Sequence, residues 1–189
     1  MYLGVSMPTI FSHVAPALIV GLALGRERMS RPLLICASIA AISPDFDGIS
    51  FWLDMPRGTL LSHRGFTHSV GFATIIASMG ASFAPRLGCK RWVAGLTLFL
   101  AVLSHPLYDM LTNGGSGVAL WWPFSSQRVF FDWRPIAVAP ISAARLFSAR
   151  GWNVLLSELT WIWLPWLGIG LMLAWLRRQY DTSKAQMHA

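Results

Sequence analysis

Residues 92–109 read WVAGLTLFLAVLSHPLYD, an apolar run that ends in a histidine and an aspartate. His105 and Asp109 are four residues apart, so they lie one turn apart on the same face if the helix continues past the run 92–104. Pro106 is suited to the first position of a new helical turn, directly after His105. The stretch therefore predicts an apolar helix with two metal-ligating side chains at its end.

The composition of the whole chain indicates a lipid environment. Of the 189 residues, 54% are hydrophobic and 12% are charged, and the mean hydropathy is +0.52. Soluble domains carry about a quarter charged residues, and tryptophan, of which this chain has ten, is typical of membrane interfaces. We expect an all-α, multi-spanning integral membrane protein in which residues 1–189 form one domain.

Apolar runs predict about five short transmembrane helices. Only the last run approaches the roughly 20 residues that cross a bilayer comfortably. The second run is short enough to be a buried or re-entrant helix, so residues 32–44 are not assigned a full crossing. The five runs are 10–25, 33–44, 69–85, 92–104 and 159–176.

Basic residues set the expected topology. They cluster at 26–31, 86–91 and 177–184, each next to an apolar run. If residues 1–9 face outside, five crossings bring all three clusters to the cytoplasmic side, as the positive-inside rule expects. Nine of the fifteen Lys and Arg lie on that side and six in the outer loops; because the basic residues form no single long patch, we expect no nucleic-acid partner. The segments 45–68 and 110–158 are then outer loops.

Histidines and aspartates stand at the outer ends of the predicted helices. Charge alone defined the outer side, so their convergence there is an independent observation. A single such residue often caps a helix, but several polar groups at membrane depth are costly and usually functional. The sequence therefore predicts a metal site formed by His13, Asp45, Asp47, His63, His68, His105 and Asp109.

The spacing of these residues suits coordination. The stretch after Pro44 is expected to be extended or turned, which points the carboxylates of Asp45 and Asp47 the same way. His63 and His68 flank a turn that contains glycine. Imidazole and carboxylate ligands suit zinc first, and manganese or iron as alternatives. Seven candidates exceed the three protein ligands of one catalytic zinc, so either several ions bind or some residues orient ligands or transfer protons.

The same motifs carry a family resemblance. Residues 7–13, 44–47, 63–69 and 104–109 resemble the YdjM/YbcI-type family of bacterial inner-membrane proteins, which are described as metal-dependent hydrolases. The element HRGFTHS at 63–69 is the most specific of these motifs, and the resemblance covers most of the chain from Met7 onward. It implies an inner-membrane location, a divalent metal and hydrolase activity. A distant similarity of such proteins to zinc-dependent phospholipase C and P1 nuclease implies phosphoester substrates.

The expected function is a metal-dependent hydrolase that acts at the periplasmic face. Its substrate would be an ester or phosphoester, either a small molecule or linked to a membrane lipid. Asp47 or Asp109 is the expected general base, and Arg64 would hold an anionic group, with Arg128 or Arg134 as further candidates for this role.

Two other functions remain open on this sequence. A metal or proton transporter would also place ionisable residues at membrane depth, although here they gather at one helix end rather than along a path. A non-catalytic membrane scaffold could use a structural metal to hold the helix ends together. Asp54, Asp132 and Glu158 belong to no motif and are interpreted as loop or helix-end charges. The sequence does not indicate an oligomeric state.

Overall fold

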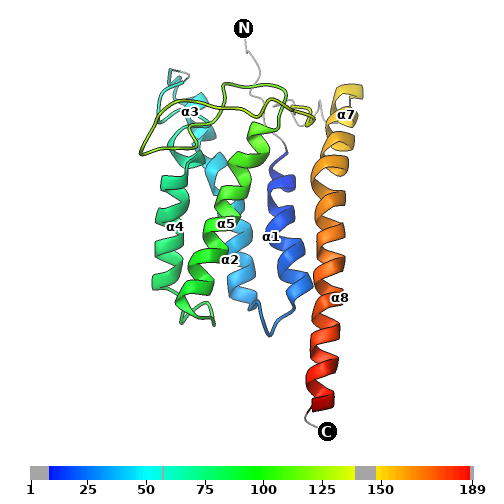
Figure 1. Ribbon diagram of the computed structural model, residues 1–189. Helices are drawn as coiled ribbons and strands as arrows, with labels where there is room; N and C mark the ends of the chain where they lie inside the picture. Colours follow the sequence, from blue (N-terminus) through cyan, green and yellow to red (C-terminus); the bar gives the residue numbers. More distant parts are fainter. Residues whose placement is uncertain (1–8, 57, 139–147, 188–189) are drawn as a thin grey trace.

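The computed structural model describes residues 9–56, 58–138 and 148–187. Every regular secondary-structure element assigned within these residues is a helix. Five apolar helices lie side by side and alternate in direction along the chain (Figure 1). The predicted helical class is confirmed, and each apolar run corresponds to one helix. These are α1 (Ile10–Leu24), α2 (Arg31–Ile42), α4 (Val70–Ser82), α5 (Arg91–Met110) and α8 (Leu164–Met187).

Three continuous helical segments are long and apolar enough to cross a membrane: Arg31–Trp52, Arg91–Met110 and Ala149–Met187. The other two apolar helices, α1 and α4, are shorter, with 15 and 13 residues. Small side chains such as Ala37, Ala73 and Ala94 form the core between α2, α4 and α5. Small residues let helix backbones approach closely in a membrane, where dispersion contacts replace the hydrophobic effect as the packing force.

Local signals explain where several helices begin and end. Ser30 and Ser69 accept hydrogen bonds from the amides of Leu33 and Phe72, so each caps the start of a helix. Gly25 ends α1 with a φ of 76°, a conformation that only glycine adopts readily. The turns at the basic end of the bundle are short, so adjacent helices are antiparallel neighbours.

The segment 45–68, predicted as an outer loop with an extended or turned stretch after Pro44, contains short helices. A 3₁₀-helix, η1 (Ser43–Gly48), follows α2 directly and leads into α3 (Ile49–Trp52), and a second 3₁₀-helix, η2, covers Phe66–His68. Pro44 lies in the first turn of η1, where a missing amide hydrogen costs nothing. With about three residues per turn, η1 points Asp45 and Asp47 in different directions instead of the same one.

Two other helix boundaries differ from the expectation. Pro106 lies inside α5, which continues without a new start to Met110. The second outer loop ends before α7 (Ala149–Glu158), because α7 runs through a π-helical turn, η3 (Leu159–Trp163), into α8. Both changes lengthen a helix at the end where the polar residues gather.

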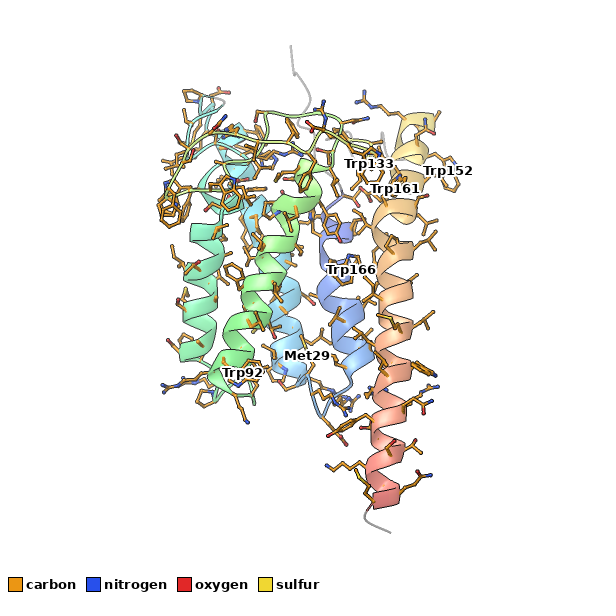
Figure 2. All side chains as sticks on the ribbon, in the orientation of Figure 1. Met29, Trp92, Trp133, Trp152, Trp161 and Trp166 are labelled. Atoms are coloured by element: carbon orange, nitrogen blue, oxygen red, sulfur yellow. The ribbon has the colours of Figure 1, made fainter. Side chains whose placement is uncertain are left out.

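The two ends of the bundle differ in chemistry. The end with α3 and α7 carries the long loop 111–138, and the other carries the short turns and the C-terminal part of α8 (Figure 1). Figure 2 shows Trp133, Trp152 and Trp161 near the loop end, and Trp92 near the opposite end. Trp133 and Trp161 pack edge to face with ring centroids 4.7 Å apart. Tryptophans at both ends are typical of a helix bundle that spans two membrane interfaces.

Candidate metal centre

All seven predicted ligands lie together at the loop end of the bundle. His13 comes from α1, the two aspartates at 45 and 47 from η1, and His68 from η2, while His105 and Asp109 come from α5. His63 belongs to the loop before η2. Four of the seven side chains are fully buried, and none is more than 7% exposed. The helix ends and loops thus enclose a polar cluster and shield it from solvent.

One group of three residues consists of His13, His105 and Asp109, whose ligand atoms all lie within 4.8 Å of one another. The imidazole rings of His13 and His105 stack with centroids 3.5 Å apart. Nδ1 of His105 lies 2.8 Å from the carbonyl oxygen of Ala41. A carbonyl can only accept a hydrogen bond, so Nδ1 carries the proton and Nε2 presents its lone pair to the cluster.

The second group consists of Asp45, His63 and His68, again with ligand atoms within 4.8 Å of one another. Asp47 lies behind both imidazoles of this group. Its Oδ1 is 2.7 Å from Nδ1 of His63, and its Oδ2 is 3.0 Å from Nδ1 of His68. A carboxylate that holds Nδ1 leaves Nε2 free for a cation, which is the usual arrangement around metal-binding histidines. Asp47 is therefore placed to orient ligands.

Short contacts join the two groups into one cluster. Nε2 of His68 lies 3.2 Å from Oδ2 of Asp109, and Nε2 of His105 lies 3.2 Å from Oδ1 of Asp45. Burial lowers the pKa of His68, but the negative charges of the adjacent Asp109 and Asp47 carboxylates outweigh that effect and raise this pKa to about 9. A cation and a proton therefore compete for the same imidazole.

The buried polar atoms that lack a hydrogen-bond partner indicate what kind of ligand the cluster could bind. Among the described residues, the fully buried side-chain atoms that lack a hydrogen bond are both nitrogens of His13, both oxygens of Asp45, and Nε2 of His63, His68 and His105. Such atoms cost free energy unless something satisfies them. Every one of them belongs to the two groups, and a mixed nitrogen and oxygen donor set suits a divalent transition metal. The residues present therefore fit the metal that the family resemblance implies.

Arg64, predicted to hold an anionic group, donates its hydrogen bonds to other residues of the protein in this structure. Its side chain is 1% exposed, and it donates from Nε and Nη2 to the two oxygens of Asp109 at 3.2 and 3.1 Å. Further donations go to the carbonyl of Gly114 and the hydroxyl of Thr112. Its backbone adopts a φ of 64°, which is uncommon for a residue other than glycine and often marks a functional site.

The two other arginines considered for anion binding differ from each other. Arg128 ties two loops together, because its guanidinium donates to the carbonyls of Thr59, His63 and Gly117. Burial lowers the pKa of Arg128. Arg134 is exposed, and its guanidinium carbon lies 5.0 Å from the ring centroid of Phe130. Arg134 is therefore the one of the three whose charge faces outward.

Glu158, which the sequence did not single out, is a buried part of the same end. It is 1% exposed, and its oxygens accept from the amide and hydroxyl of Thr9 at 2.5 and 2.6 Å and from the hydroxyl of Ser12 at 2.7 Å. Trp163 donates to the same Ser12 oxygen at 3.0 Å. Glu158, the last residue of α7, therefore caps the start of α1, close to His13 in the sequence. Its position at the border of an apolar run is the one sequence signal that could have found it. Asp54 and Asp132 are exposed, as expected of loop charges.

Comparison with known proteins places the chain in a family. The sequence model of the family described as "YdjM inner membrane protein" matches residues 7–182. A relative described as "Inner membrane protein YbcI", from Escherichia coli strain K12, is 41% identical over 178 residues, which cover 91% of this chain and 100% of the relative. No solved structure matches. With its apolar helices, the chain is an inner-membrane protein, and it belongs to the YdjM inner membrane protein family.

Proposed function

We propose that this protein is a metal-dependent hydrolase whose site lies at the periplasmic face of the inner membrane. The observation that carries the proposal is the set of buried nitrogen and oxygen atoms without partners, all of which converge at the loop end of the bundle. Polar atoms buried at membrane depth are expensive, so a ligand that satisfies them is the simplest reason for their presence.

Two divalent cations fit the arrangement of the donors. One would be held by His13, His105 and Asp109, and the other by Asp45, His63 and His68. Zinc suits this donor set best, with manganese or iron as alternatives. A divalent cation would act as a Lewis acid that polarises an ester or phosphoryl oxygen. It would also lower the pKa of a water molecule bound to it toward neutrality.

The three carboxylates of the cluster have different surroundings. Both oxygens of Asp47 face imidazole Nδ1 atoms, which supports an orienting role for Asp47, and both oxygens of Asp109 accept from Arg64, which would position Asp109 as a ligand. Both oxygens of Asp45 lack a hydrogen bond among the described residues. Asp45 is therefore the carboxylate best placed to ligate and to accept a proton from a nearby water.

The position of the site suggests an amphiphilic substrate. The ligands stand at the ends of membrane helices, on the side where Trp133 and Trp161 gather (Figure 2). Tryptophan belts mark the level of lipid headgroups, so an ester or phosphoester of a lipid-linked molecule would reach this depth without leaving the membrane. The exposed guanidinium of Arg134 is available for an anionic group of such a substrate.

Hydrolysis by the purified protein tests this proposal. We expect turnover of phosphodiester, phosphomonoester or carboxylester lipids that is abolished by a chelator and restored by zinc or manganese. Asp45→Asn should abolish turnover, whereas Asp132→Asn, an exposed carboxylate with no place in the cluster, should not. If no substrate of this panel is cleaved, and metal removal melts the protein, the metal is structural and the hydrolase proposal fails.

Orientation needs a separate test. A cysteine at Ser126, an exposed position of the loop 111–138, should react with a membrane-impermeant maleimide in intact spheroplasts. Cys89 lies between α4 and α5 at the opposite end and serves as an internal control that should react only after lysis. The reverse pattern would place the metal cluster at the cytoplasmic face.

A further inference from the structure

The basic end of the bundle holds a second feature, far along the helices from the metal cluster. A hollow of about 580 Å³ opens between the turn after α1 and the C-terminal part of α8. Its charged lining residues come from these two segments only, with two acidic and four basic side chains. They are Glu27, Asp181, Arg26, Arg28, Arg177 and Arg178.

Positive charges outnumber negative charges in this hollow, four arginines to two carboxylates. Arg28 is paired with Asp181, Nη2 to Oδ1 at 2.7 Å. In the part of the chain that the structure describes, no hydrogen bond or ion pair within 4.0 Å engages the guanidinium groups of Arg26, Arg177 and Arg178. Three guanidinium groups thus face one hollow with a single remaining carboxylate, Glu27, and the region attracts an anion.

Gly25 makes room for one of these arginines. A β-carbon added at Gly25 would lie 2.0 Å from Nη1 of Arg177, so the guanidinium rests against the bare backbone of the turn. A larger residue would displace it. The guanidinium of Arg177 therefore fits against the turn after α1, at the rim of the hollow between two helices.

An apolar hollow adjoins the charged one. It has a volume of about 340 Å³ and shares Leu24, Arg28 and Arg177 with its neighbour, while Leu173, Leu176 and Tyr180 complete it. Tyr180 also lies under Arg28, with the guanidinium carbon 5.4 Å from the ring centroid. The two hollows together offer guanidinium donors on one side and aliphatic and aromatic surface on the other.

We propose that these two hollows bind one anionic phospholipid between α1 and α8, with its phosphate at Arg26, Arg177 and Arg178. A soluble phosphate would use only the charged hollow, whereas a phospholipid would use both, since its acyl chain can follow Leu173 and Leu176 toward the membrane interior. Basic pockets between membrane helices on the cytoplasmic side are known to suit anionic headgroups. The arginines also set topology, but topology alone requires neither the shared hollow nor the fit at Gly25.

The test measures lipid binding by the purified, delipidated chain in detergent. Phosphatidylglycerol should raise its thermal midpoint progressively, with the logarithm of concentration above the Kd, as expected for a ligand of the native state, while phosphatidylcholine and soluble glycerol 3-phosphate should not. The double variant Arg26→Gln with Arg177→Gln should bind phosphatidylglycerol at least about tenfold more weakly, because hydrogen bonds to a charged group are lost. Arg86→Gln with Arg91→Gln removes the same charge from the same end and should bind as the wild type does.

Several results would overturn the proposal. Equal stabilisation by phosphatidylcholine would show that any lipid suffices, and stabilisation by glycerol 3-phosphate would show a site for soluble anions. An equal loss in both double variants would reduce the effect to overall charge. If the glutamine variant does not fold, Arg26→Lys with Arg177→Lys keeps the charge but loses the bidentate guanidinium, and unchanged binding there would also contradict the proposal. Metal binding and hydrolysis are not involved in any of these results.

Discussion

Arg64 and Asp109 form a buried, two-pronged ion pair, although 45 residues separate them. The pair connects the turn that carries His63 and His68 with the end of α5, so it fixes the two groups of candidate ligands relative to each other. Arg64 also donates from Nη1 to the carbonyl of Gly114, which anchors the loop that follows α5. The geometry around the proposed cations therefore depends on an arginine that binds no metal itself.

Replacing Arg64 with methionine should destabilise the protein strongly. The substitution leaves the fully buried Asp109 without its main partner, and breaking a buried ion pair on one side costs roughly 3–5 kcal/mol. Thermal unfolding in detergent, compared with Arg134→Met as an exposed control, measures the effect. A wild-type midpoint for Arg64→Met would show that the ion pair does not support the fold.

Asp47→Asn should weaken metal binding without removing a ligand. An amide has one oxygen and one nitrogen, so it can hold only one of the two Nδ1–H groups that Asp47 now faces. Loss of such a supporting group typically lowers metal affinity about 10–100-fold. Competition with a calibrated chelator gives the affinity, and Asp132→Asn is the matched control. An unchanged affinity would mean that Asp47 does not orient the imidazoles.

Glu158→Gln should loosen the start of α1. The amide loses one of the two acceptor oxygens that hold Thr9 and Ser12, at a cost of roughly 1–3 kcal/mol for a buried group. His13 follows Ser12 directly, so we also expect a changed visible spectrum in the cobalt-substituted protein. Glu27→Gln, at the opposite end, should leave both properties unaltered. A Glu158 variant with normal stability and spectrum would contradict the proposed capping role.

Gly65→Ala should disrupt the HRGFTHS turn. A β-carbon there would lie 2.1 Å from the carbonyl oxygen of Leu60, and backbone atoms cannot give way as a flexible side chain can. Overpacking of this kind costs about 1–3 kcal/mol. Gly168→Ala is the control, because no atom lies within 4 Å of an added β-carbon there. Similar melting midpoints for both variants would show that the turn tolerates a side chain.

The sequence predicted the helices and the gathering of the ligands because both depend on local properties. Runs of apolar residues and adjacent basic clusters are read directly along the chain, and together they determine which helix ends meet. The five helices of the bundle correspond to the five runs, and all seven candidates come together at one end. No long-range packing had to be known for either prediction.

The errors arose where local rules compete or where distant segments meet. Pro44 favours an extended conformation of the preceding residue, but proline is also tolerated in the first turn of a helix. Here the chain continues directly from α2 into the 3₁₀-helix η1. The partners of Arg64 and Glu158 lie 45 and as many as 149 residues away. Because no sequence motif records such pairings, only the fold shows that Arg64 holds Asp109 and that Glu158 caps α1.

Metal content of the purified protein tests the central claim most directly. The two groups of ligands predict two divalent cations per chain, and His63→Ala with His68→Ala should lose at least the cation that those residues would hold. Elemental analysis of the wild type, this double variant and the control Asp132→Asn gives the three stoichiometries under identical purification. We expect about two, at most one, and about two cations per chain. A metal-free wild type, or full metal content in the double variant, would contradict the account.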